Sequence, residues 1–210
     1  MEQALQASLF DDPTAGPRFA SLTGVRRREL AGGAWVDVLP GWLSGSDSLF
    51  THLTTSAAWR AEKRRMYDRV ISVPRLVAFY DREVALPHPL LARARDLLSE
   101  HYRPELREAF TTAGLCWYRD GHDSVAWHGD TIGRGATEDT MVAILSLGAA
   151  RPLALRPRGG GGEAPRFSLG HGDLLVMGGS CQRTWEHAVP KTTRPTGPRI
   201  SVQFRTRGVR

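Results

Sequence analysis

The chain has 210 residues, of which 41% are hydrophobic and 24% are charged, and its 28 Lys and Arg residues against 22 Asp and Glu give a net charge of +6. These fractions are typical of a globular domain with a proper core. Two cysteines do not make a disulfide framework, and no apolar run reaches the ~18 residues of a spanning helix. Because the first residues also lack the basic and apolar regions of a signal peptide, we expect a cytoplasmic protein without membrane contact.

Helices are predicted in the first half of the chain. Residues 1–32 are expected to form a partly flexible arm and residues 33–210 a single domain. Ser46 and Asp47 are both favourable N-caps for a helix that runs towards Trp59, because apolar residues then recur on one face. Leucines and an alanine at helical spacing predict a second helix from Pro87 to about Tyr102, with that stripe in the core.

Residues 60–82 form the most basic segment, with cations such as Arg69 on either side of Tyr67. Exposed, they would hold a phosphate backbone while the ring stacks on a base. Alternatively, the segment is a solvated, charged helix end with Tyr67 packed inward. The net positive charge leaves a similar choice open, between a polyanionic partner and general arginine usage. The end of the segment, Arg75–Tyr80, has the pattern of a strand.

Short strands are predicted from Gly114 onward, separated by Gly and Pro turns. The run from Met141 to Leu147 is continuously apolar and should be buried on both faces. The glycine tract 158–163 is expected to be a hairpin loop and not a phosphate loop, because no Lys-Ser/Thr and no helix follow it. Strands preceded by helices predict an α+β fold, a double-stranded β-helix (jelly roll) core with supporting N-terminal helices.

His128 and Asp130 form a His-x-Asp pair at the end of one predicted strand. Residues i and i+2 of a strand point to the same face, so an imidazole and a carboxylate would stand side by side. With His187 as third ligand they would make a facial triad that leaves positions open on an octahedral iron. A second pair, His171 and Asp173, competes, but it opens a strand after a glycine, where Asp commonly caps the backbone.

Arg199 and Arg205 lie six residues apart in a strand-like segment and would therefore share a face. Two inward guanidinium groups cannot remain unpaired in a core. A dicarboxylate such as 2-oxoglutarate would pair them through charge-assisted bonds. An exposed basic edge strand is the alternative, and the pattern alone does not choose between the two.

From about Pro40 to Arg205 the chain resembles the AlkB family of Fe(II)/2-oxoglutarate dioxygenases, which demethylate alkylated nucleic-acid bases. The resemblance rests on a series of motifs in the same order: LPGWL (39–43), VPRL (73–76), FYD (79–81), WYRDGHDSVAWHGD (117–130), HGDLLVMGG (171–179), WEHAVPK (185–191) and PRISVQFR (198–205).

The resemblance implies the metal ligands and catalytic centre at His128, Asp130 and His187, with dioxygen bound at the same iron. It further implies 2-oxoglutarate binding by Tyr118 and by Arg199, with Arg205 near the oxalyl end or the metal-bound carboxylate. The segment near 60–82 would recognise the nucleotide, and its candidates for substrate contact are Tyr67, Arg69 and Tyr80.

Two positions depart from the family pattern. Cys116 stands where many relatives have an Asn, which removes one amide hydrogen bond to the cosubstrate. Thr131 and Ile132 follow the metal Asp, where relatives often have a second acidic residue that helps to read the base.

The implied activity is oxidative demethylation of bases such as 1-methyladenine or 3-methylcytosine in DNA or RNA, by a protein that we expect to be a monomer. An AlkB-type oxygenase that acts on a protein or another substrate is the alternative.

Overall fold

Antiparallel strands make up most of the structure, a computed structural model that describes residues 16–66 and 69–209. The strands are β1 (Arg18–Phe19), β2 (Arg26–Glu29), β3 (Ala34–Leu39), β4 (Leu43–Ser44), β5 (Arg60–Met66), β6 (Arg69–Tyr80), β7 (Thr112–Tyr118), β8 (Val125–His128), β9 (Val142–Gly148), β10 (Arg151–Pro157), β11 (Arg166–Leu169), β12 (Leu174–Gly179), β13 (Trp185–Val189) and β14 (Arg199–Arg205). The α-helices are α1 (Asp47–Ser56), α2 (Pro89–Leu106) and α3 (Cys181–Thr184).

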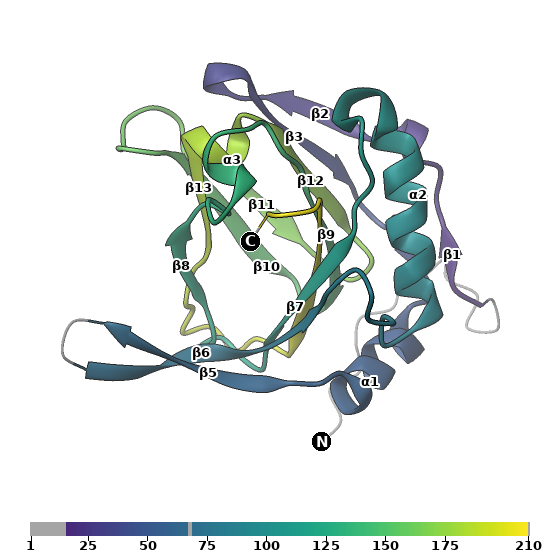
Figure 1. The fold of residues 1–210 in the computed structure, drawn as a ribbon. Coiled ribbons are helices and arrows are strands. Elements are labelled where there is room, and N and C mark those ends of the chain that lie inside the picture. The colour runs from purple at the N-terminus through teal and green to yellow at the C-terminus, as the bar shows by residue number, and fades with distance from the viewer. Residues whose placement is uncertain (1–15, 67–68, 210) are drawn as a thin grey trace.

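Two sheets face each other and enclose the centre of the molecule (Figure 1). The larger sheet has the strand order β2-β3-β12-β9-β14-β7-β6-β5, and the smaller has the order β11-β10-β13-β8. The small β1-β4 sheet lies apart from both. Strands that are distant in sequence are neighbours in each sheet, as in a jelly roll. The predicted fold class is therefore confirmed.

Two hydrophobic clusters occupy the two faces of the larger sheet, and β9 contributes to both. Val142 and Ile144 belong to the cluster between the sheets, whereas Ala143 and Leu145 pack on the side of α1 and α2. Every residue of β9 is buried, as the continuous apolar run predicted, because a central strand covered on both faces has no polar side.

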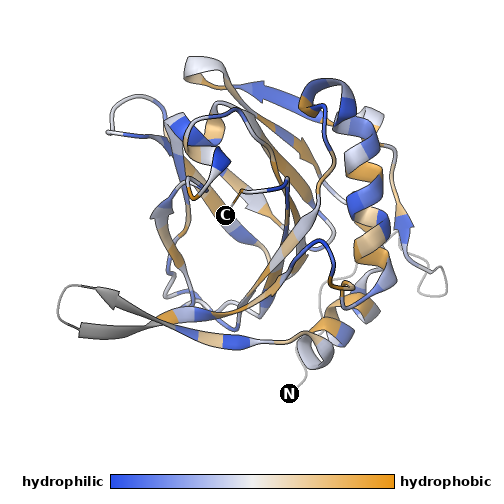
Figure 2. Ribbon diagram, viewed as in Figure 1, coloured by the Kyte–Doolittle hydropathy of each residue, from blue (hydrophilic) through white to orange (hydrophobic). Residues whose placement is uncertain are grey.

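Helix α2 lies across the outer face of the larger sheet (Figure 1). Its buried side chains recur every three or four residues: Leu91, Ala94 and Leu98 belong to the predicted stripe, and Tyr102 extends it by one turn. Hydrophobic and hydrophilic residues accordingly alternate along the helix in Figure 2. Pro89 at the first position and the His88 ring, whose Nδ1 accepts the Leu90 N–H at 3.2 Å, begin the helix.

The structure corrects two expectations about the first eighty residues. The arm predicted for residues 1–32 contains two strands of the fold, because β1 pairs with β4 and β2 pairs with β3 at the edge of the larger sheet. Arg27 reinforces this pairing with two 2.8 Å bonds to the buried carboxylate of Asp37. The charged helix end considered for residues 60–66 is instead β5, which forms an antiparallel hairpin with β6; this hairpin extends from the body in Figure 1.

None of the helices in the described ranges combines the length and the apolar composition that crossing a membrane requires.

Candidate metal centre and cosubstrate pocket

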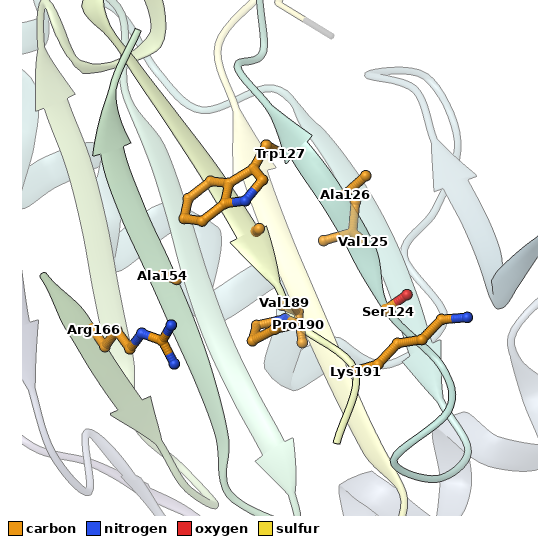
Figure 3. A pocket seen from close by; sticks show the side chains of 10 residues that line it. Ser124, Val125, Ala126, Trp127, Ala154, Arg166, Val189, Pro190 and Lys191 are labelled. Atoms are coloured by element: carbon orange, nitrogen blue, oxygen red, sulfur yellow. The ribbon is translucent and has the colours of Figure 1, made fainter. Parts of the chain in front are cut away.

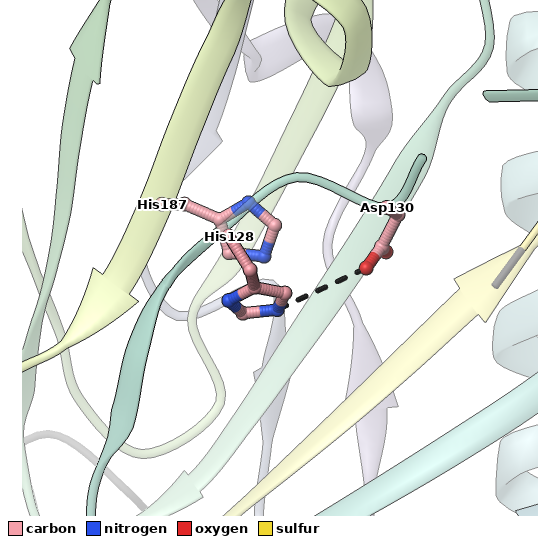
Figure 4. Close-up of side chains that lie close together, drawn as sticks. All are labelled: His128, Asp130 and His187. Carbon is pink, nitrogen blue, oxygen red and sulfur yellow. Dashed lines mark ion pairs between the residues drawn. The ribbon is translucent and has the colours of Figure 1, made fainter. Parts of the chain in front are cut away.

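The three predicted metal ligands lie together between the two sheets. His128 ends β8, Asp130 follows two residues later, and His187 on β13 is the antiparallel partner of His128. The two imidazole ring centroids are 4.3 Å apart, and His128 Nε2 lies 3.9 Å from Asp130 Oδ1. One ligand atom from each residue lies within 4.8 Å of the others (Figure 4). Two nitrogens and one carboxylate oxygen in this arrangement fit a facial triad.

Neighbouring backbone groups orient the two ligands of the His-x-Asp pair. The Nδ1–H of His128 donates to the carbonyl oxygen of Ala126 at 2.8 Å, which leaves Nε2 directed towards Asp130. A Cβ at Gly129 would lie 2.7 Å from the carbonyl oxygen of Gln182, so this close approach requires glycine. The Asp130 N–H donates to Gln182 Oε1 at 3.1 Å. Sequence analysis missed Gln182, because no motif distinguishes it from other polar residues.

The electrostatic surroundings keep Asp130 and His187 in their ligating forms. Burial raises the pKa of Asp130, but the Arg205 guanidinium and the two imidazoles outweigh it and hold this pKa at about 2. Arg205 Nε donates to Asp130 Oδ2 at 2.6 Å, so Arg205 lies beside the candidate metal carboxylate. Burial lowers the pKa of His187 to about 3, with the nearby His128 acting in the same direction. A neutral imidazole and an ionised carboxylate are the forms that bind a cation.

Arg199 lies deep between the sheets, with 1% of its surface exposed. It pairs in register with Tyr118 of β7, so both side chains occupy the same inner face, and the guanidinium carbon lies 5.5 Å from the centre of the Tyr118 ring. Arg199 Nε donates to Ser146 Oγ at 2.9 Å. Its Nη1 is buried and has no hydrogen-bond partner among the described residues. A buried cation with an unpaired donor fits a ligand carboxylate.

Arg151 is a second buried arginine beside Tyr118, and sequence analysis missed it. Its guanidinium carbon lies 5.8 Å from the centre of that ring. Arg151 donates to the carbonyl oxygens of Asp120, Asp123 and Pro190, at 2.8, 3.0 and 2.8 Å. These bonds join the turn before β8 to the end of β13, and they thereby connect the two strands that carry the imidazoles.

The competing pair at 171–173 serves the backbone, as expected. Asp173 accepts N–H groups from Gly41 at 2.8 Å and from Gly170 at 2.7 Å. The His171 Nδ1 accepts the Gly148 N–H at 2.8 Å. These bonds tie together the turns at one end of the larger sheet.

Of the three candidates for substrate contact, Tyr67 lies outside the described residues, and Arg69 is placed only as the first residue of β6. The structure does not bring Tyr80 to the metal centre. Its side chain is buried in the cluster on the helix side of the larger sheet, and its hydroxyl accepts the Ala58 N–H at 3.2 Å. The strand alternation of β6 directs Tyr80 away from the enclosed space where the triad lies.

A jelly roll with this triad between its sheets, and with a buried arginine on the same inner surface whose Nη1 has no partner among the described residues, defines the class of 2-oxoglutarate-dependent iron oxygenases. Comparison with known proteins agrees. The model of the 2OG-Fe(II) oxygenase superfamily matches residues 47–205. The alpha-ketoglutarate-dependent dioxygenase alkB homolog 3 of Bos taurus is 30% identical over 226 residues, which cover 94% of this chain and 78% of the relative.

Two further matches are more distant. The DNA oxidative demethylase ALKBH2 of Homo sapiens is 29% identical over 124 residues, which cover 56% of this chain and 46% of the relative. The solved structure of OsALKBH1 superposes with a TM-score of 0.57 at 15% identity, covering 85% of this chain and all of that one, and so supports the fold. The chain belongs to the AlkB family of 2-oxoglutarate- and Fe(II)-dependent dioxygenases.

Proposed function

We propose that this chain removes N-linked methyl groups from nucleic-acid bases, with 1-methyladenine and 3-methylcytosine in DNA or RNA as substrates. The central observation is the convergence of two imidazoles and one carboxylate within 4.8 Å, together with the unpaired Nη1 of the buried Arg199 on the same inner surface. The names of the relatives, a DNA oxidative demethylase among them, support nucleic acid as the substrate. The net charge of +6 suits a polyanion.

In this proposal, His128, Asp130 and His187 would hold Fe(II), and Arg199 would pair with a carboxylate of 2-oxoglutarate. The buried Tyr118 lies beside Arg199 and would line the same pocket. The chemistry supplied there is oxidative decarboxylation of 2-oxoglutarate to succinate and CO2 by dioxygen, coupled to hydroxylation of the methyl carbon, which leaves the base as formaldehyde.

The residues of the chain bind and orient the reactants and control their charges. Arg205 keeps Asp130 ionised, and the bond that Arg199 Nε donates to Ser146 Oγ orients the guanidinium. The His128 side chain is 38% exposed, while Asp130 is 5% exposed, so the target base reaches the triad from the side of His128. A methylated atom within a duplex is inaccessible there, and the base has to be flipped out or single-stranded.

The test is a panel of oligonucleotides with one methylated base each, incubated with Fe(II), 2-oxoglutarate and dioxygen and analysed by mass. A mass decrease of about 14 units, the net loss of one CH2 group, supports the proposal if succinate and formaldehyde form in equal amounts. His187→Ala should abolish both products. Succinate formation without methyl loss from any base would refute nucleic-acid demethylation and favour a protein or small-molecule substrate.

A further inference from the structure

The outer face of the smaller sheet carries an exposed aromatic side chain next to a hollow. Trp127 of β8 is 36% exposed, one of the few large hydrophobic side chains that are exposed in the described residues. Its ring borders a cavity of about 170 Å³ that is also lined by Ala154, Pro190, Arg166 and Lys191 (Figure 3). None of these five residues belongs to the metal centre or to the cosubstrate pocket.

The cations of this surface are available to an anion. Neither Arg166 nor Lys191 forms an ion pair with a residue that the structure describes. The neighbouring Arg156 is different, because it is neutralised by Glu186 at 2.7 Å and packs over the Trp127 ring at 4.4 Å. Two cations without an ion pair among the described residues, lining a mostly apolar hollow with an aromatic wall, complement a nucleotide, which has a flat base and a negative phosphate.

The surface also lies on the route by which a nucleic-acid strand would leave the metal centre. Trp127 directly precedes the ligand His128, and β8 is the edge strand of the smaller sheet. His128 is the exposed member of the triad. Successive side chains of a β-strand point to opposite faces. A nucleic-acid strand that passes over the edge of β8 would therefore run from the inner face at His128 to the outer face at Trp127.

We propose that this surface, the β8 platform (Trp127, Pro190, Arg166 and Lys191), binds a nucleotide that flanks the target base in the same strand. The base packs against Trp127 and Pro190, and Arg166 and Lys191 each contact one of the two phosphates that flank it. The inference rests on the proposed function, since it extends the nucleic-acid path beyond the catalytic centre. It predicts that oligonucleotides long enough to cross β8 bind more tightly than a trinucleotide centred on the metal.

The test measures binding of unmethylated, fluorescently labelled oligothymidylate of 15 or 3 nucleotides to the full chain by anisotropy. Trp127→Ala should weaken the 15-mer about tenfold, within the range for loss of one stacked base, and should change the trimer much less. Trp127→Phe, which keeps an aromatic face, should restore most of the affinity. The double variant Arg166→Glu/Lys191→Glu should also weaken the 15-mer and reduce its salt slope by about 1.4, for two phosphate contacts on a single strand.

Arg18→Glu/Arg26→Glu is the matched control, because it also reverses two charges, at exposed strand arginines of β1 and β2 that lie outside the smaller sheet. The β8 platform is overturned if this control weakens the 15-mer as much as the Arg166/Lys191 double variant does, or if neither that double variant nor Trp127→Ala weakens it. It is also overturned if polyglutamate of equal charge competes as well as the oligonucleotide. Melting temperatures establish that the variants fold, and the charge variants test the surface independently if Trp127→Ala does not fold.

The outcomes separate this inference from the proposed function. Tight, Trp127-dependent binding of the 15-mer without demethylation of any base would refute the proposed function and leave the β8 platform standing. Demethylation at equal kcat/KM for 3-mer and 15-mer substrates, with length-independent binding, would refute the β8 platform and leave the function standing.

Discussion

Replacing Arg199 by methionine should weaken binding of 2-oxoglutarate and stabilise the ligand-free chain. Arg199 is 1% exposed, and its Nη1 has no partner in the described residues. Truncating one partner of a buried charge pair costs about 2–5 kcal/mol. Since every 1.4 kcal/mol corresponds to a factor of ten, the dissociation constant should rise by about 30-fold to a few thousand-fold.

The same substitution removes an unsatisfied charge from the free protein. Burial already lowers the pKa of Arg199, and an unsatisfied buried polar group costs about 1–3 kcal/mol. The Ser146 hydroxyl remains within 3.4 Å of the Leu169 carbonyl oxygen, so Arg199→Met leaves no new orphan there. The free energy of unfolding of the ligand-free chain should therefore rise by about 1–3 kcal/mol.

Calorimetry with Mn(II) in place of Fe(II) measures the affinity without turnover, and urea unfolding of the metal-free chain measures stability. Arg26→Met, which removes an exposed arginine, should leave both unchanged. An unaltered affinity of Arg199→Met for 2-oxoglutarate would refute the assignment of Arg199 to its carboxylate. A large loss of stability would show instead that the cation serves the fold.

Three further outcomes follow from the site. Ser146→Ala removes the 2.9 Å bond that directs the Arg199 guanidinium, and the loss of about 1 kcal/mol should raise the KM for 2-oxoglutarate roughly fivefold; an unchanged KM would mean that packing alone orients the arginine. Iodoacetamide at pH 8 should label the half-buried Cys116 but not Cys181, since burial raises the pKa of the Cys181 thiol to about 12. Peptide mass mapping measures the labelling, and it should also find Cys116 protected by Mn(II) with 2-oxoglutarate. Labelling of Cys181 would contradict its burial. The metal-free chain should lose stability as the pH falls below about 6.5 towards 3, because the folded pKa of His187, about 3, lies below the ordinary 6.5 and the unfolded chain binds more protons. As the pH falls, the urea midpoint should decline less steeply for His187→Gln than for the unsubstituted chain. Equal slopes for the two proteins would show that this imidazole is already protonated or exposed.

Local sequence determined the elements and the chemistry of the candidate site. The apolar run of β9 and the stripe of α2 were predicted because periodicity depends on neighbouring residues alone. The spacing of His128 and Asp130 likewise placed two ligand types near each other before any fold was known. The alternation of β14 placed Arg199 and Arg205 on one face, although the pattern alone left open whether that face was buried.

Tertiary structure decided which distant groups meet. The register of β8 and β13 sets His187 opposite His128, and the packing of α3 brings the Gln182 amide to the Asp130 backbone. Tyr80 turned out to be buried because helices cover that face of β6, and β2 joined the larger sheet because β3 offered a free edge. Such outcomes depend on burial and pairing between residues far apart in the chain, whereas the periodicity of a segment carries no information about what will cover it.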